Sequence, residues 1–252
     1  MILRDDRNDI AVLTLAHGKV HALDLDLLRA LDARLAEVER SPARAVVLTG
    51  SGTVFSAGVN LVRLLEGGPT YLRDFLPALT SAMERLFFFP KPVVAAVNGH
   101  AIAGGCVLAC ACDRRLMARG PTTIGVTELL VGVPFPSIAL EVMRFALPSQ
   151  HFQEALYTGR TWGVDEALRR GLIDDIVEAP ALLERACAVA STLAAIPSPT
   201  FRLTKEDIRR PARERWEAGR ARVDAEVAEI WDAAPAREAI QRYVERTLGK
   251  GR

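Results

Sequence analysis

Cysteine is scarce in this 252-residue chain, which contains only four. Cys106, Cys110 and Cys112 lie close together in one apolar segment, and Cys187 stands apart. The spacing C-x-x-x-C-x-C is not a usual zinc pattern. We therefore expect no metal site, and we expect buried, reduced thiols that act as small hydrophobes in a reducing, cytoplasmic compartment.

A targeting segment, a membrane segment and an excess of one charge are also missing. Residues 1–7 are too charged for a signal peptide. No stretch reaches the roughly 18 apolar residues that a membrane helix needs. The 32 basic and 31 acidic residues leave a net charge of +1, so no global field attracts nucleic acid or an anionic membrane. We expect neither partner, although a local basic patch remains open.

Several common active-site motifs are absent. The chain has no G-x-x-x-x-G-K-[ST], G-x-G-x-x-G, H-E-x-x-H or G-x-S-x-G sequence. Its four histidines, His17, His21, His100 and His151, are scattered without metal-ligand spacing. His100 lies near a glycine turn, where we expect it mainly to pack or to form hydrogen bonds. A role for His100 in a pocket is the alternative.

What is present is an ordinary globular balance of 50% hydrophobic and 25% charged residues, over a length that can bury a sizeable core. Strands are predicted at 10–15, 45–48, 93–97, 115–118 and 173–177, and helices at 25–39 and 72–86. From residue 181 only helices are predicted, at 181–195, 213–231 and 236–248, with prolines 197, 199, 211 and 235 between them. This pattern indicates an α/β core over 1–180 with a helical extension over 181–252, not two independent domains.

Two segments bring an apolar run to a turn of small residues. The first spans 55–61, and the second spans 91–106, where the predicted strand 93–97 is followed by Asn98-Gly99. A helix opens at Gly104-Gly105. Its first N–H groups and its positive dipole end suit an oxyanion. An N–H from the turn at 57–59 would complete a hole with two donors.

These segments resemble the crotonase family of enoyl-CoA hydratases and isomerases. Residues 20–23 resemble its first coenzyme A loop, 158–177 resemble its T-G to G-L-I segment, and 201–205 resemble the start of its C-terminal helices. The five motifs follow the family's order, and the resemblance covers most of the chain. The resemblance implies an α/β fold, a right-handed spiral of ββα units. It also implies C-terminal helices that form a trimer, often paired into a hexamer.

The resemblance also assigns roles to residues. Val59 and Gly104 match the two oxyanion donors. Glu128, within Gly125 to Gly132, matches the catalytic glutamate, and apolar neighbours should raise its pKa and suit it to proton transfer. From spacing alone, a surface carboxylate is the alternative for Glu128.

Coenzyme A is implied as part of an acyl-CoA substrate, with no permanently bound cofactor. The matching contacts are Ala22, Ala57, Asn60 and Leu61, and Asn60 stands where family members commonly have Asp. Basic residues of the C-terminal region could meet the 3′-phosphate, but a solvated basic face is the preferred interpretation; they are Lys205, Arg209 and Arg210. The tryptophans are expected to be packing anchors; they are Trp162, Trp216 and Trp231.

Two departures from the family's hydratases point toward an isomerase. Val107 stands where hydratases carry a second glutamate, and hydration needs water held by two carboxylates. Residues 133–136 place Phe135 where hydratases are glycine-rich, which would fill space and exclude water. The favoured function is therefore Δ3,Δ2-enoyl-CoA isomerisation with one glutamate, as a homotrimer or a dimer of trimers. The alternatives are a hydratase with a rearranged site and a non-catalytic acyl-CoA binding protein.

Overall fold

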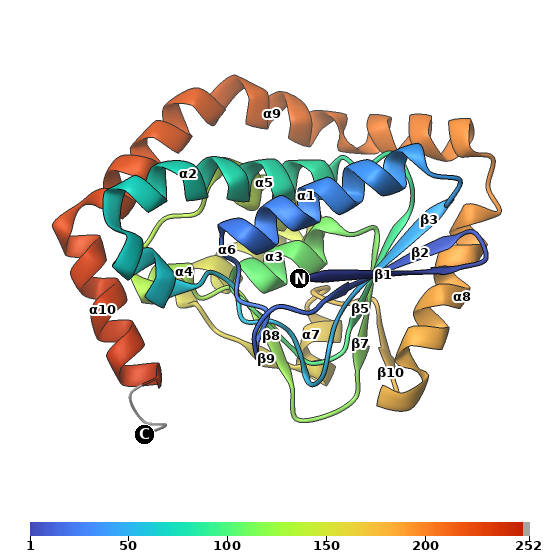
Figure 1. Cartoon of the computed structure of the whole chain (residues 1–252), viewed down its shortest axis with the longest axis horizontal. Coiled ribbons are helices and arrows are strands. Elements are labelled where there is room, and N and C mark those ends of the chain that lie inside the picture. The colour runs from blue at the N-terminus through green and yellow to red at the C-terminus, as the bar shows by residue number, and fades with distance from the viewer. Residues whose placement is uncertain (249–252) are drawn as a thin grey trace.

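The computed structural model describes residues 1–248, and its strands form two sheets (Figure 1). The six-stranded sheet has the order β1-β2-β3-β5-β7-β10, and only its β1–β2 pair is antiparallel. The four-stranded sheet has the order β4-β6-β8-β9. The strands are β1 (Ile2–Arg7), β2 (Ile10–Leu15), β3 (Ala45–Gly50), β4 (Val54–Ser56), β5 (Val93–Val97), β6 (His100–Ile102), β7 (Arg114–Ala118), β8 (Thr123–Gly125), β9 (Trp162–Gly163) and β10 (Asp175–Val177).

Helices cover both faces of the larger sheet, which explains why β3 and β5 read as continuous apolar runs. One face packs on α1 (Leu25–Arg40), α2 (Leu61–Phe87) and α3 (Gly104–Ala111). The other face packs on α8 (Leu182–Ala194), whose Leu182, Ala186, Ala190 and Ala194 recur at helical spacing. Helix α8 therefore packs as part of the α/β core. That an oligomerisation region begins at residue 181 stays a prediction.

Most predicted elements are confirmed, including the Asp24 cap, which accepts a hydrogen bond from Leu27 N. Helix α2 is longer than predicted because it continues through a kink at Gly68 (φ 58°), which precedes Pro69. Shorter helices complete the core; they are α4 (Glu128–Val131), α5 (Ser137–Ala146), α6 (Ser149–Thr158), α7 (Val164–Arg169) and the 3₁₀ turn η1 (Ala179–Ala181). Strand β1 was not predicted, because four of its six residues are charged and they hide the alternation of apolar and polar residues that marks a strand.

The prediction that Pro211 separates two helices is wrong. A single helix, α9 (Ser198–Asp232), runs through Pro211 and lies along α2 and α5, and α10 (Ala234–Leu248) follows it (Figure 1). An interior proline removes one backbone hydrogen bond. Buried side chains on either side of it, Arg209 and Ala212, hold the helix in place here.

The preferred interpretation of Lys205 and Arg209 as a solvated basic face is also wrong. Both are buried and both bind Asp113, at 2.7 Å for Lys205 Nζ and 2.8 Å for Arg209 Nη2. Arg209 Nη1 also donates to the Ala111 carbonyl at the end of α3. Arg210 alone is exposed, where it pairs with Asp207. The first two therefore anchor α9 to the core.

The expectations for His100, the tryptophans and three of the four cysteines are confirmed, whereas Cys187 is only partly buried. Three cysteines are buried and all four are free. His100 Nδ1 accepts a hydrogen bond from Thr123 N, and the tryptophans, Trp162, Trp216 and Trp231, are buried.

Residues 1–248 contain neither a metal-ligand cluster nor a single membrane-spanning helix. No group of three or more His, Cys, Asp or Glu side chains in this part of the chain could hold a metal ion. No single helix there is both long and apolar enough to span a membrane. Only a pair bent by 99°, Ala179–Ala194 with Ser198–Asp232, reaches that length and composition together.

Candidate active site

The loop at 20–23 and the turn at 57–59 pair with each other. Leu23 N donates to Gly58 O at 2.7 Å, and Asn60 N donates to Leu23 O at 2.9 Å. Ser56 Oγ, which is buried, donates to His21 O and accepts from Gly58 N. These bonds fix the turn at 57–59 against the loop at 20–23.

Gly58 brings this turn to the start of α3. A Cβ at Gly58 would lie 2.6 Å from Ile102 O and 3.1 Å from Gly104 N, so only glycine allows the approach. Within residues 1–248, neither the Val59 N–H nor the Gly104 N–H donates a hydrogen bond. Two unused backbone donors therefore lie on adjoining segments.

Ala103, directly before α3, has a strained backbone. Its φ of 51° lies in the left-handed region, which residues other than glycine seldom adopt. Ala103 N donates to Gly125 O at 2.8 Å, a bond that holds this conformation. Strain of this kind concentrates at functional sites, and here it directs the chain from β6 into the N-terminus of α3.

Glu128 reaches the same region along the neighbouring strand. β6 and β8 are parallel, with Ile102 opposite Gly125. β6 leads into α3 and β8 leads into α4, so both helices begin at the same edge of the sheet. A hydrogen bond to Cys110 and burial raise the pKa of the Cys106 thiol, and the charge of Glu128 adds to that rise. The start of α4, with Glu128, and the start of α3 therefore lie at the same edge of this sheet.

The Glu128 carboxyl group is buried, which disfavours its charged form and raises its pKa to about 7. Its Oε2 has no hydrogen-bond partner in the described part of the chain. The other buried glutamate, Glu141, is bound by Arg144 and Arg215 instead. Among the buried carboxylates of residues 1–248, Glu128 is thus the one without a cation.

Apolar side chains occupy the two positions at which the sequence departs from hydratases. Val107 on α3 is fully buried, and Phe135 is only 4% exposed. Both belong to one contiguous apolar cluster with Val131, the last residue of α4, and Val133, which follows the helix. Therefore neither Val107 nor the segment after α4 supplies a polar side chain that could hold a water molecule opposite Glu128.

A cavity of about 440 Å³ opens beside the two loops. It is lined by all four predicted coenzyme A contacts, Ala22, Ala57, Asn60 and Leu61, together with Val59. Lys205 and Arg209 line a different cavity, of about 290 Å³. The structure therefore brings the predicted loop residues together and leaves those two basic residues apart from them.

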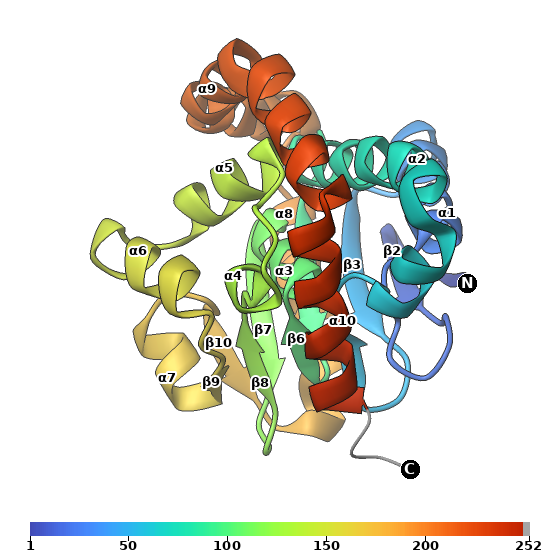
Figure 2. The same cartoon turned by 90° about the vertical axis from the view of Figure 1, so that its left-hand side faces the viewer.

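Sequence reasoning missed two parts of this cavity. The first is His17 to Lys19, which extends the loop at 20–23 and could have been found from its two basic side chains. The second is one face of α10, with Tyr243, Val244 and Thr247. This helix lies against α2 and α4 (Figure 2), a long-range contact that no local pattern reveals.

Comparison with known proteins agrees with this geometry. The family model for "Enoyl-CoA hydratase/isomerase" matches residues 5–249. The chain is 30% identical to mouse (Mus musculus) mitochondrial enoyl-CoA delta isomerase 1 over 80% of this chain and 71% of that protein. It is 38% identical to a putative enoyl-CoA hydratase of Thermus thermophilus over 72% of this chain and 71% of that protein.

A solved structure confirms the predicted α/β, crotonase-like fold. The crystal structure of human mitochondrial delta3-delta2-enoyl-CoA isomerase superposes with a TM-score of 0.95 at 26% identity, covering 100% of this chain and 99% of that one. The chain belongs to the enoyl-CoA hydratase/isomerase family.

Proposed function

We propose that this protein is a Δ3,Δ2-enoyl-CoA isomerase that uses Glu128 as its only acid/base group. The observation that carries the proposal is a single buried, cation-free carboxylate at the start of α4, a helix that begins at the same sheet edge as α3 with its unused Gly104 N–H. An isomerase needs one group that removes a proton and returns it elsewhere. A raised pKa suits a group that must both accept and donate near neutral pH.

In the proposed reaction, the thioester oxygen lies between the N–H groups of Val59 and Gly104. The Glu128 carboxylate removes a proton from C2 of a 3-enoyl thioester, and the negative charge moves onto that oxygen. The carboxyl group then returns the proton to C4, and a double bond remains between C2 and C3. Each backbone donor should contribute about 3–4 kcal/mol to lowering the barrier.

Hydratases are also found among the relatives, so hydration is the second candidate. It needs a water molecule held and activated near Glu128. Val107 offers no hydrogen bond for that purpose, and a missing acid or base typically costs roughly 10²–10⁴-fold in rate. We therefore favour isomerisation over hydration.

The deciding experiment offers the purified protein cis-3-enoyl-CoA and trans-2-enoyl-CoA of the same chain lengths. We expect conversion of the first to the 2-enoyl thioester and little hydration of the second. Rapid hydration without isomerisation would assign a hydratase with a rearranged site. Tight binding of acyl-CoA with neither reaction would assign a binding protein.

The raised pKa of Glu128 predicts how the rate depends on pH. Only the carboxylate can remove the C2 proton, so kcat/KM should fall about tenfold per pH unit below a pKa of about 7. Above that pH it should level off. The measurement is kcat/KM for the 3-enoyl substrate between pH 5 and 9, and a profile that stays flat down to pH 5 would contradict the assignment.

The raised pKa of Glu128 also makes the stability of the folded protein depend on pH. The folded-state pKa lies above the ordinary value of 4.5, so the native state binds more protons between these two pH values. The stabilisation linked to Glu128 is therefore fully present below pH 4.5 and is lost as the pH rises through 7. Glu128→Gln should remove this dependence from denaturant unfolding curves.

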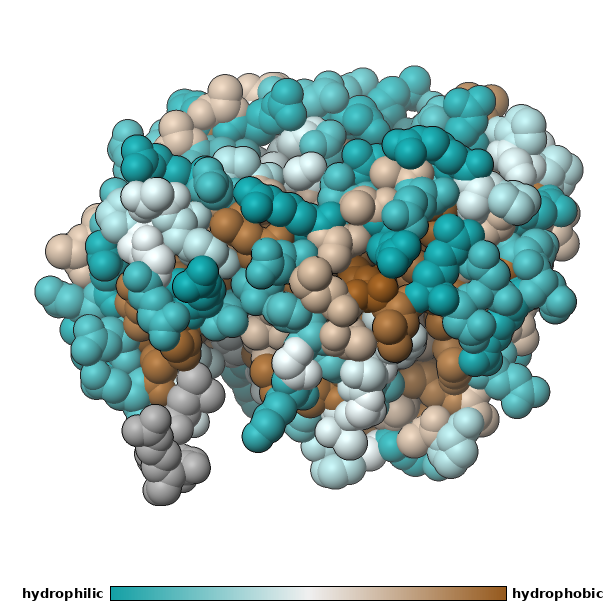
Figure 3. Space-filling model, viewed as in Figure 1, coloured by the Kyte–Doolittle hydropathy of each residue, from teal (hydrophilic) through white to brown (hydrophobic). Residues whose placement is uncertain are grey.

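For assembly we propose a homotrimer or a dimer of trimers. Val227 and Trp231, two apolar side chains of α9, are covered within the same chain. Other apolar side chains on α9 do remain exposed; they are Leu203 at 68%, Ile208 at 58% and Ile230 at 47%. On the face in Figure 3, brown apolar residues gather in recesses between hydrophilic ones. We expect sedimentation to show trimers or hexamers, and a stable monomer at micromolar concentration would contradict this.

A further inference from the structure

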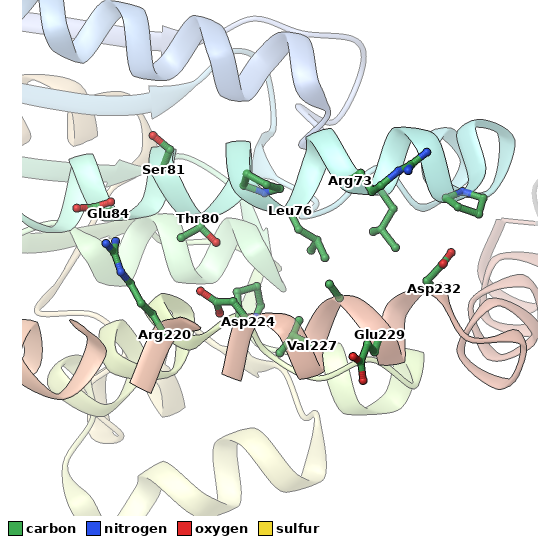
Figure 4. A pocket seen from close by; sticks show the side chains of 15 residues that line it. Arg73, Leu76, Thr80, Ser81, Glu84, Arg220, Asp224, Val227, Glu229 and Asp232 are labelled. Atoms are coloured by element: carbon green, nitrogen blue, oxygen red, sulfur yellow. The ribbon is translucent and has the colours of Figure 1, made fainter. Parts of the chain in front are cut away.

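Helix α9 borders a cavity along each half of its length. Its second half and α2 enclose a cavity of about 630 Å³, across which Leu76 and Val227 point toward each other (Figure 4). None of the four cysteines, all of which lie within residues 1–248, lines this cavity. The first half of α9 borders the cavity of about 290 Å³ described above, and two cysteines, Cys110 and Cys112, lie in its wall. We call this second cavity the thiol cavity.

The thiol cavity reaches the surface of the protein. Thr204 and Ile208 of α9 and Phe145 of α5 line it and are exposed, Ile208 at 58%. Cys110 itself is only 1% exposed, so its sulfur is reached through the cavity and not from open solvent. Liquid water occupies about 30 Å³ per molecule. The cavity therefore has room for a solute a little larger than water.

Positive charge gathers in the wall of the thiol cavity. It is lined by three cations and one carboxylate; they are Arg115, Lys205 and Arg209 with Asp113. The carboxylate of Asp174 pairs with Arg115 at 2.8 Å. The guanidinium of Arg115 also donates a hydrogen bond to the Cys110 sulfur. Cations beside a sulfur stabilise its thiolate, the form that reacts with oxidants.

The four cysteines differ in how their sulfur atoms are bonded. The Cys106 thiol donates a hydrogen bond to the Cys110 sulfur one turn along α3, which raises the pKa of Cys106 and lowers that of Cys110. Burial opposes the lowering at Cys110, and the positive charge of Arg115 adds to it. Burial raises the pKa of both other thiols, Cys112 and the partly buried Cys187. Cys110 is therefore the sulfur with the most thiolate character.

We propose that Cys110 is a peroxide-reactive thiol, which hydrogen peroxide reaches through the thiol cavity. The thiolate sulfur attacks one oxygen of the peroxide, so that a sulfur–oxygen bond forms and the oxygen–oxygen bond breaks. Hydroxide leaves and takes up the proton that the thiol released, and the products are a sulfenic acid and water. The sulfur is oxidised by two electrons, and the peroxide is reduced by the same two. The cations of the cavity wall stabilise the negative charge of the departing hydroxide.

The test treats the native, assembled protein with hydrogen peroxide and follows each cysteine by tandem mass spectrometry. Cys110 should gain oxygen roughly tenfold faster than Cys187, although Cys187 is the more exposed of the two. A thiol reductant added early should restore the Cys110 thiol, because sulfenic acid formation is reversible. Cys110→Ala should remove the fast phase of peroxide consumption and leave the slow phase unchanged.

Two further variants test the route through the cavity and do not alter the thiol. Thr204→Trp places a large side chain at the exposed mouth of the thiol cavity and should slow the oxidation of Cys110 severalfold. Thr200→Trp makes the same change at an exposed position of the same helix that does not line the cavity, and should behave as wild type.

Several results would overturn the proposal. Oxidation of Cys187 before Cys110 would do so, as would a fast phase that persists in Cys110→Ala, which would assign it to another sulfur. Oxidation of Cys110 only after unfolding would show that the assembled protein gives peroxide no access to the cavity. Equal rates in Thr204→Trp and Thr200→Trp would show that the cavity is not the route.

Discussion

Glu128→Gln should lower the isomerisation rate by roughly 10²-fold or more and leave the binding of acyl-CoA nearly intact. Glutamine keeps the size and shape of the side chain but cannot accept the C2 proton at neutral pH. Binding should survive because the proposed oxyanion donors are backbone groups and the lining of the cavity beside the coenzyme A loops is unchanged. The effect should therefore fall on kcat, measured with the 3-enoyl substrate, and the titration near pH 7 should disappear.

Glu141→Gln is the matched control, because Glu141 is also a buried glutamate but is bound by Arg144 and Arg215. It should reduce stability while the folded protein keeps its kcat and its pH profile. If Glu128→Gln retains full activity with an unchanged pH profile, a single-base mechanism through Glu128 cannot hold. If both variants lose activity equally, the loss reflects folding and the assignment of Glu128 loses its support.

The parts of the site that could be predicted from sequence are those set by local backbone chemistry. Glycines mark the close approach of Gly58 to Gly104, because a side chain there would collide with the backbone. The strand β5 and the start of α3 were readable from their apolar run and small-residue turn. The burial that raises the pKa of Glu128 was expected from its apolar neighbours, whereas its lack of a cationic partner needed the structure.

What could not be predicted depends on contacts between distant segments. The face of α10 that carries Tyr243 and Val244 lines the same cavity as Ala57, which is more than 180 residues away in sequence. Likewise, Lys205 and Arg209 look like solvent-exposed helix residues until Asp113 is placed beside them. In both cases tertiary packing overrides the local pattern, because charge and periodicity alone do not reveal which residue will lie opposite.

Asp113→Asn should be among the most destabilising single changes in the chain, at about 3–5 kcal/mol of unfolding free energy. Asp113 accepts hydrogen bonds from Lys205, Arg209 and Val93 N, with donor–acceptor distances of 2.7 to 2.8 Å. Asparagine removes the one negative charge between two buried cations, so their desolvation is no longer offset. Urea unfolding at a fixed protein concentration measures the loss, and Asp207→Asn in the exposed pair with Arg210 should change stability by about 0–1 kcal/mol.

The pH dependence separates this ionic effect from a loss of packing. Burial already lowers the pKa of Lys205 to about 8 from 10.5, so the unfolded state binds more protons between these values and wild-type stability rises with pH there. Without Asp113 the pKa of Lys205 should fall further, and the rise should begin below pH 8. The deficit of Asp113→Asn should therefore shrink between pH 7 and 9, whereas a packing defect would cost the same at both. A deficit under 1 kcal/mol, or one that does not change with pH, would show that Asp113 is not what neutralises the buried anchor of α9.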